Sequence, residues 1–140
     1  MDQKDREILK FLKENSRMPY TEIAFKLGMS EGAIRKRISK MEENGIIERY
    51  TVEVNPKKMG YDAVVLLGMD VEPKYFLSAA RELSGFECVK WVYTSTGDHS
   101  IMAEVWAKDT MNLENIISEK ISKIKGVSNL CPAILMDKIK

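Results

Sequence analysis

The chain has 140 residues, of which 44% are hydrophobic and 31% are charged, and its formal net charge is +1 at pH 7. This length allows one domain or two small ones, and the apolar fraction is sufficient for packed cores. No apolar run reaches the length of a membrane span, no secretory signal is evident, and two cysteines make no disulfide framework, so we expect a cytoplasmic protein without a membrane partner.

The first predicted element is a helix from about Asp2 to Asn15. Its apolar residues share one broad face, namely Ile8, Leu9, Phe11 and Leu12. Asp2 and Asp5 suit the positive N-terminal end of a helix dipole. Pro19 interrupts the chain before the next helix. We expect this first helix to complete a three-helix core.

Residues 20–44 are predicted to form two helices around a glycine turn. Each helix has one apolar stripe, formed by Ile23, Ala24 and Leu27 in the first and by Ile34, Ile38 and Met41 in the second. Gly28 can take the positive φ that ends a helix, and Ser30 is a good N-cap for the next one. Asn44-Gly45 ends the second helix. This is the helix-turn-helix pattern, which places its second helix in the major groove of DNA.

The second helix turns a basic side away from its apolar stripe. Between Gly28 and Met41 there are four basic residues and one acidic residue, although the whole chain is nearly neutral. Cations on this side can reach phosphates and guanine edges, and small residues permit a close approach. The candidate contacts to double-stranded DNA are Ser30, Gly32, Arg35, Lys36, Arg37, Ser39 and Lys40.

A basic side alone is typical of any solvated helix surface, so the DNA-binding interpretation depends on the glycine turn and the serine cap beside it. Arg37 lies at the edge of the apolar stripe. A second interpretation gives this arginine an ion pair with a neighbouring carboxylate such as Glu42 or Glu7. Both roles of Arg37 stay open at this point.

The rest of the chain predicts a linker and a second domain. The alternation from Ile46 to Val54 predicts a strand, and Asn55-Pro56 predicts a turn. The later pattern is strand, helix, strand, strand, helix, strand, over residues 63–71, 73–84, 87–95, 101–107, 110–124 and 130–136. This split βαβ order places both helices on one sheet face. The fold class is α+β: a helix-turn-helix three-helix unit (1–48), a strand linker (49–60) and a ferredoxin-like βαββαβ effector and dimerisation domain (61–140).

The predicted sheet is apolar on both faces. Val64 and Leu66 alternate with Val65 and Leu67, whereas a sheet with one wet face should alternate with polar residues. The face without helices therefore needs a cover, and a second copy of the chain provides one. A homodimer also places two recognition helices against a two-fold symmetric DNA site. The alternative is that the N-terminal unit folds over this face within one chain.

Other residue combinations predict no catalysis and no metal or cofactor. A single histidine, His99, does not build a catalytic triad. Cys88 and Cys131 lack the C-x-x-C spacing of zinc sites and belong to opposite edge strands, so we expect free buried thiols. An acylphosphatase-like enzyme shares the strand order, but the acidic Val71-Glu72-Pro73 segment is unlike a phosphate-binding loop.

Several short segments occur in a recognisable order: Asp5-Arg-Glu-Ile-Leu9, Thr21-Glu-Ile-Ala24, Leu27-Gly28, Arg37-Ile38, Met41-Glu42, Gly45-Ile-Ile47, Asn55-Pro56, Gly60-Tyr61 and Thr96-Gly97-Asp98. In order and spacing they resemble the Lrp/AsnC (feast/famine) family of transcription regulators over nearly the whole chain. The Cys131-Pro-Ala-Ile134 segment is similar to archaeal members. The resemblance implies a sequence-specific regulator that binds promoter or operator DNA as a dimer or a higher oligomer such as an octamer.

The resemblance also implies an amino-acid or other small-molecule effector, held between neighbouring effector domains near a Gly-Asp turn. Carried over to this chain, the candidate effector contacts are Ser95, Thr96, Gly97, Asp98 and His99. Asp98 would accept a hydrogen bond from an α-ammonium group, and backbone N–H groups of the turn would bind an α-carboxylate. His99-Ser100 departs from the family, in which many ligand-responsive members have an aromatic and an acidic residue. The alternative is a plain hairpin turn, for which Gly-Asp pairs are common.

Two other functions stay open beside regulation. An architectural chromatin protein would wrap DNA without site preference. A small-molecule sensor would bind its ligand as its main task and DNA only secondarily.

Overall fold

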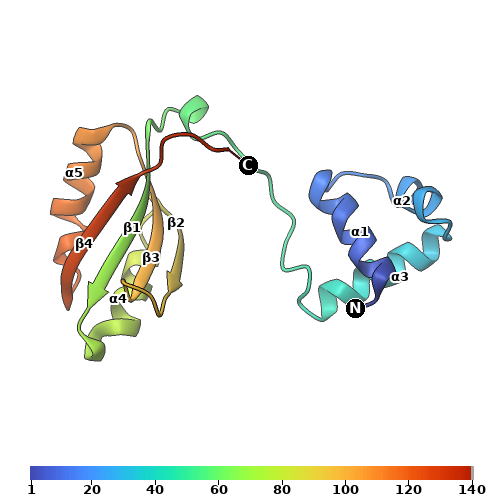
Figure 1. The fold of residues 1–140 in the computed structure, drawn as a ribbon, viewed down its shortest axis with the longest axis horizontal. Helices are drawn as coiled ribbons and strands as arrows, with labels where there is room; N and C mark the ends of the chain where they lie inside the picture. Colours follow the sequence, from blue (N-terminus) through green and yellow to red (C-terminus); the bar gives the residue numbers. More distant parts are fainter. Residues whose placement is uncertain (140) are drawn as a thin grey trace. The chain divides into compact units, whose positions relative to one another are not determined.

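The computed structural model describes residues 1–139, and the chain divides into two compact units. We call Met1–Glu53 the helical unit and the residues from Val54 onward the sheet unit (Figure 1). The division between them lies inside the predicted linker, residues 49–60.

The helical unit consists of α1 (Gln3–Glu14), α2 (Tyr20–Leu27) and α3 (Glu31–Glu43). α1 begins with a capping box, in which the Asp2 side chain accepts from the Asp5 N–H and the Asp5 side chain accepts from the Asp2 N–H. The three helices share one core of buried residues: Ile8, Leu12, Ile23, Ala24, Ile34, Ile38 and Met41. Full burial of each large side chain in this core contributes about 2 kcal/mol to folding. The predicted three-helix core is confirmed.

The structure assigns no strand to Ile46–Val54, where the sequence alternation predicts one. A strand needs a hydrogen-bonded neighbour, and within residues 1–139 no segment pairs with this one. The predicted turn after it is present: the Lys58 N–H donates to Asn55 Oδ1 at 3.2 Å as the 3-10 helix η1 (Lys57–Met59) begins.

The sheet unit contains four strands and two helices. In chain order these are β1 (Ala63–Val71), α4 (Phe76–Ser84), β2 (Val89–Thr94), β3 (Ile101–Ala107), α5 (Thr110–Glu119) and β4 (Val127–Ile134). The strands lie in the order β2-β3-β1-β4, and every neighbouring pair is antiparallel (Figure 1). This is the predicted ferredoxin-like βαββαβ arrangement.

Both helices of the sheet unit pack on one face of the sheet. Every second residue of the two central strands points into this core, namely Ala63, Val65, Leu67 and Met69 of β1 and Ile101, Ala103, Val105 and Ala107 of β3. They meet Ala79 and Leu83 of α4 and Leu113 and Ile116 of α5. The helix predicted over 110–124 is shorter in the structure, because the backbone leaves the helical region at Lys120 and continues as the 3-10 helix η3 (Ile121–Lys123).

The other side of the sheet, which we call the open face, carries no helix among the described residues. The strand registers place on it Val64, Leu66, Gly68 and Asp70 of β1, Trp91 and Tyr93 of β2, Met102, Glu104 and Trp106 of β3, and Asn129, Cys131 and Ala133 of β4. Most of these residues are apolar, and Tyr93 is 67% exposed. The expectation of an apolar, uncovered sheet face is therefore confirmed for the sheet unit taken by itself.

Candidate nucleic-acid interface and effector turn

The turn between α2 and α3 has the geometry that the sequence predicts. Gly28 ends α2 with a left-handed φ of 63°. Ser30 caps α3, and its Oγ accepts a hydrogen bond from the Ala33 N–H at 3.2 Å. Ile34, Ile38 and Met41 are buried against α1 and α2, so the orientation of α3 about its own axis is fixed.

This orientation turns Lys36 and Lys40 outward. Both side chains are exposed, and no ion pair joins either ammonium group to a carboxylate anywhere in residues 1–139. Gly32 is exposed in the first turn of the same helix, and a Cβ built there would meet no atom within 4 Å. Ser39 is half-buried between the two lysines. The outer side of α3 thus offers two unpaired cations beside an unobstructed backbone.

Arg35 lies on the same helix in a more restrained setting. Its Nη2 is 2.7 Å from Glu31 Oε1, one helical turn earlier, and its guanidinium lies 5.2 Å from the centre of the Tyr20 ring. The side chain is nevertheless 63% exposed. An exposed i,i+4 pair is worth only about 0.3–0.5 kcal/mol, so DNA phosphates or bases can compete for this arginine.

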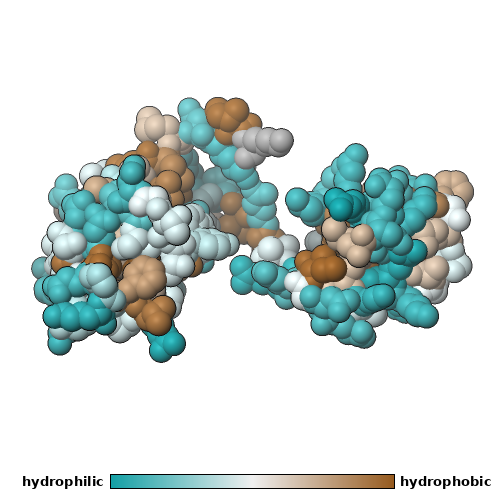
Figure 2. Space-filling view, turned by 60° about the horizontal axis from the view of Figure 1, so that its bottom comes forward, coloured by the Kyte–Doolittle hydropathy of each residue, from teal (hydrophilic) through white to brown (hydrophobic). Residues whose placement is uncertain are grey.

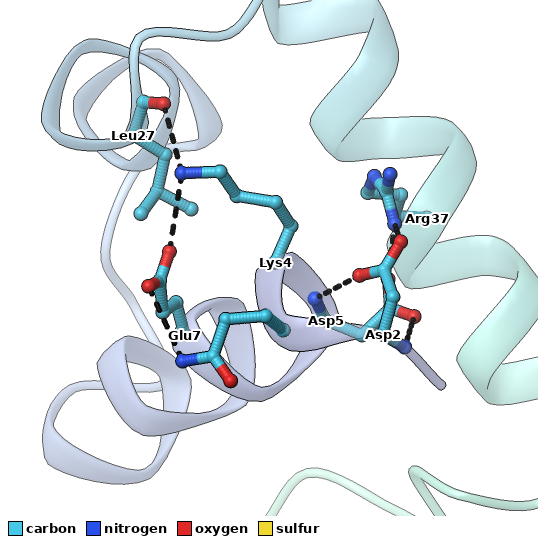
Figure 3. Close-up of polar contacts among 7 residues, drawn as sticks. Asp2, Lys4, Asp5, Glu7, Leu27 and Arg37 are labelled. Carbon is cyan, nitrogen blue, oxygen red and sulfur yellow. Dashed lines mark hydrogen bonds and ion pairs between the residues drawn. The ribbon is translucent and has the colours of Figure 1, made fainter.

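Arg37 is paired within the helical unit, at its surface. Figure 3 shows its guanidinium directed from α3 toward the start of α1, where Nη1 lies 2.7 Å from both Asp2 Oδ2 and Asp5 Oδ1. The structure therefore supports the ion-pair interpretation of Arg37, but with partners other than the expected Glu42 or Glu7. We leave this residue out of the proposed DNA contacts.

The carboxylates first expected beside Arg37 have other partners. Glu7 accepts from Lys4 Nζ at 3.3 Å, and this ammonium also donates to the Leu27 carbonyl at 3.5 Å (Figure 3). Glu42 accepts from the Tyr50 hydroxyl at 2.8 Å, and burial together with this hydrogen bond raises the pKa of Tyr50. The second contact ties the start of the linker to α3.

The pairing with Arg37 changes the titration of both aspartates. The pKa of Asp2 lies below its ordinary value, first because the Asp5 N–H donates to its side chain and then because Arg37 does. The pKa of Asp5 is lowered in the same way, by the Asp2 N–H and then by Arg37. The Asp-x-x-Asp spacing at the start of α1 predicts the capping box, but it does not predict that Arg37 pairs with these two aspartates.

The candidate effector turn connects β2 to β3 over residues 95–100. It is closed by the Ser95 N–H, which donates to the Ser100 carbonyl at 2.9 Å, and the Gly97 N–H donates to Ser95 Oγ at 3.2 Å. Thr96, Gly97 and Asp98 are exposed at its tip. Gly97 is not among the glycines with positive φ, so the turn is not of the tight primed type. It does join the antiparallel strands β2 and β3, so the plain hairpin turn stays open beside the effector role.

His99 does not point into solvent with the rest of the turn. Its ring covers Gly68 of β1 so closely that a Cβ on this glycine would lie 2.2 Å from His99 Cδ2. His99 Nδ1 lies 3.2 Å from Asp70 Oδ1, and Asn129 Nδ2 donates to Asp70 Oδ2 at 3.1 Å. Hydrogen bonding from Asn129, followed by that from His99, lowers the pKa of Asp70. The sequence analysis missed this cluster, although a glycine inside a strand signals a close approach.

The remaining candidate groups form no centre of their own. Within the described part of the chain, no group of three or more His, Cys, Asp and Glu side chains is placed to hold a metal ion. Cys88, just before β2, and Cys131 of β4 are free and lie at opposite edges of the sheet, as expected, but Cys88 is half-buried and Cys131 is exposed, so neither is the buried thiol that the sequence predicts. None of the helices in residues 1–139 has both the length and the apolarity to cross a bilayer.

Figure 2 shows hydrophilic side chains over much of both units, with smaller hydrophobic patches between them. The outer side of α3 and the open face of the sheet belong to different units.

Comparisons with known proteins match both units. Residues 1–48 match a family described as winged helix-turn-helix DNA-binding, and residues 63–140 match one described as the Lrp/AsnC ligand binding domain. The HTH-type transcriptional regulator LrpA of Pyrococcus horikoshii is 50% identical over 140 residues, which cover 100% of this chain and 99% of the relative.

Solved structures agree with this match. The structure of E. coli AsnC is 30% identical with a TM-score of 0.90, covering 100% of this chain and 95% of that one. A transcriptional regulator of Neisseria meningitidis, described as a complex with L-Met, has a TM-score of 0.88 at 18% identity, covering 100% of this chain and 92% of that one. At this lower identity the likeness concerns the fold alone.

Proposed function

The chain belongs to the Lrp/AsnC family of DNA-binding transcription regulators, and we propose that α3 is the helix with which it reads its operator. Lys36 and Lys40 contact phosphates, Arg35 reaches a phosphate or a guanine edge, and Gly32 and Ser39 permit the close approach of α3. Ser30 contributes mainly as the N-cap of this helix. The observation that carries the proposal is the pair of exposed lysines without carboxylate partners among the described residues, beside an arginine that is already paired inside the unit.

The functional unit that we propose is a homodimer formed through the open face of the sheet. This face is apolar and carries no helix of the sheet unit in the described range. Covering it with a second copy removes apolar surface from water and gives the molecule a two-fold axis. Two copies of α3 then match a symmetric operator, and octamers would be assembled from such dimers.

For the effector we propose a small molecule, an amino acid in the first place, bound at the turn of residues 95–99. Asp98 is exposed there to accept from an ammonium group, while Asp70 holds His99 back against the sheet. The Neisseria meningitidis regulator with L-Met has the same fold, which makes amino acids the first class to test.

A footprint on the promoter of the chain's own gene tests the regulatory function. We expect a discrete, two-fold symmetric protected site, because a dimer presents two α3 helices. Smeared protection without sequence preference would instead support the architectural protein. The named relatives are transcriptional regulators, and nothing in the comparisons favours this alternative.

A thermal-shift screen of the twenty amino acids tests the effector. A ligand at a hundredfold excess over its Kd should stabilise the protein by about 3 kcal/mol. Asp98→Asn should remove the shift, whereas Asp62→Asn, at an exposed position in the same unit, should keep it. A protein that shifts with none of the twenty would contradict an amino-acid effector.

A further inference from the structure

The open face carries a feature that the proposed DNA and effector sites do not use, a carboxylate held between two indole rings. Trp91 Nε1 donates to Glu104 Oε2 at 2.8 Å, and Trp106 Nε1 donates to Glu104 Oε1. We call these three residues the indole clamp. All three are half-buried, and the two tryptophans are the only ones in the chain.

The strand register produces this arrangement. Trp91 of β2 lies directly opposite Glu104 of β3, and Trp106 follows two residues later on the same strand. The register shifts between Val89 and Trp91, and this irregularity brings Trp91 to the open face, on which Glu104 and Trp106 lie by the alternation of β3. Each carboxylate oxygen meets a different indole.

Further aromatic rings extend the clamp across the open face. Trp91 meets Tyr93 edge-on with ring centres 5.4 Å apart, and Trp106 lies 5.5 Å from Tyr61. The ammonium group of Lys90 lies 5.0 Å from the Trp106 ring. The result is a row of aromatic side chains with one carboxylate at its centre.

A carboxylate on an apolar surface is costly to bury unless hydrogen bonds satisfy it. Here uncharged donors of the same face satisfy it, and hydrogen bonds to a charged acceptor are about twice as strong as neutral ones. The clamp also fixes two large side chains before any partner arrives, which lowers the entropy cost of association. Tryptophans fixed in this way are typical anchors of protein interfaces.

The charges of the open face favour a second copy as its partner. Glu104 has its two indole donors, and Asp70 has Asn129 and His99. Two such faces can meet without placing an unsatisfied carboxylate of one copy against that of the other. A strongly basic partner would find both carboxylates already hydrogen-bonded.

We propose that Glu104 is a positioning residue for self-association, which holds Trp91 and Trp106 as the anchor pair of the homodimer. This inference rests on the proposed function, which assigns the dimer interface to the open face. Loss of the carboxylate frees both indoles and weakens the dimer, although Glu104 itself need not touch the partner.

The test uses the full-length protein with Glu104→Gln, which keeps the size of the side chain but removes the charge and one acceptor. Glu114→Gln is the matched control, because Glu114 is an exposed residue of α5. Sedimentation velocity measures the dimer dissociation constant. Tryptophan emission reports the clamp directly, since both tryptophans of the chain belong to it.

We expect Glu104→Gln to raise the dimer dissociation constant by at least about tenfold, because each copy loses a charge-assisted hydrogen bond. Tryptophan emission should also change at dilutions where the protein is monomeric. Glu114→Gln should change neither quantity. Trp91→Phe, which removes one donor, should weaken the dimer in the same direction and serves as the second variant should Glu104→Gln not fold.

The outcomes separate this inference from the function on which it rests. A dimer whose dissociation constant is unchanged by Glu104→Gln, or by Trp91→Phe where the first variant does not fold, would overturn the role of Glu104 and leave the homodimer standing. A wild-type protein that stays monomeric at every concentration would overturn the homodimer itself, including the case in which another part of the chain covers the open face.

Discussion

Arg37 and Lys36 are neighbours on α3, yet their surroundings give them different tasks. Arg37 has two aspartates of α1 within 2.7 Å, whereas the Lys36 ammonium has no carboxylate partner in residues 1–139. The pairing of Arg37 spans 35 residues of sequence, from Asp2 to α3. Spacing along a helix gives the direction of a side chain but not the distant group that it meets, so only the structure could separate the two.

Arg37→Ala should destabilise the helical unit in a pH-dependent way. The pKa values of Asp2 and Asp5 are held below the ordinary 3.8 in the folded chain. The stabilisation is therefore fully present above 3.8 and is lost as the pH falls through the lowered pKa values. Thermal unfolding should show a lower midpoint for the variant at about pH 7 and a much smaller difference at about pH 2. A deficit of the same size at both pH values would contradict the pairing.

Gly68→Ala should displace the His99 ring. The added Cβ would lie 2.2 Å from Cδ2 and 2.6 Å from Cγ of His99. The whole ring must therefore move, and it loses its contact with Asp70. We expect a loss of about 1–3 kcal/mol in urea unfolding, as for other overpacked sites, and a shifted NMR signal of the only histidine. Gly97→Ala is the control, because its Cβ would meet only Ser95 Oγ, at 3.7 Å. Equal stability and equal histidine signals in the two variants would contradict this packing.

The helices were predictable because their signals are local. Asp2 and Ser30 cap α1 and α3, and Gly28 ends α2, as their positions in the sequence indicate. The strand predicted over Ile46–Val54 has no pairing segment in the described chain. The alternation of residue types within a segment does not show whether another segment lies beside it to form hydrogen bonds. The helix predicted to reach Ile124 ends at Glu119 although the apolar spacing continues, because η3 buries Ile121 in a tighter turn.

Gly32→Ala should separate the stability of α3 from its contact with DNA. A methyl group there meets no protein atom within 4 Å, and alanine favours a helix over glycine by up to about 1 kcal/mol. The unfolding temperature should rise, while affinity for the operator should fall by about tenfold because the backbone can no longer approach as closely. Gly28→Ala should instead lower the unfolding temperature, because the φ of 63° at this position strains any residue with a Cβ. An affinity for the operator unchanged by Gly32→Ala would mean that DNA does not meet this side of α3.

The whole molecule combines two cores with different surfaces, an α3 surface with unpaired cations that we assign to DNA and an apolar sheet face that we assign to a second copy. The fold of each unit was predictable from the spacing of its apolar residues and from the order of its predicted helices and strands. The indole clamp and the His99–Gly68 contact were not, because both depend on which strands become neighbours. Trp91 and Glu104 are paired only by the register of β2 against β3. The family resemblance likewise points to the candidate effector turn but not to the packing of the His99 ring over Gly68.

Val64→Asp should dissociate the proposed dimer. Val64 lies on the central strand β1 of the open face, opposite Trp106 on β3, where an added carboxylate has no donor prepared for it. We expect a monomer in light scattering and weaker binding to a two-half-site operator. Leu77→Asp, at a 62% exposed position of α4, should leave both properties unchanged. A dimeric Val64→Asp protein would place the interface elsewhere.

The most direct test of the DNA-binding surface is the salt dependence of operator affinity for the wild type and for the double variant Lys36→Ala/Lys40→Ala. Each phosphate contact releases about one counterion, and a dimer on its operator presents two copies of both lysines. The slope of log K against log salt should therefore become shallower by about four. Lys13→Ala, an exposed cation of α1 in the same unit, should keep the wild-type slope. An unchanged slope in the double variant would contradict the assignment of the outer side of α3 to DNA.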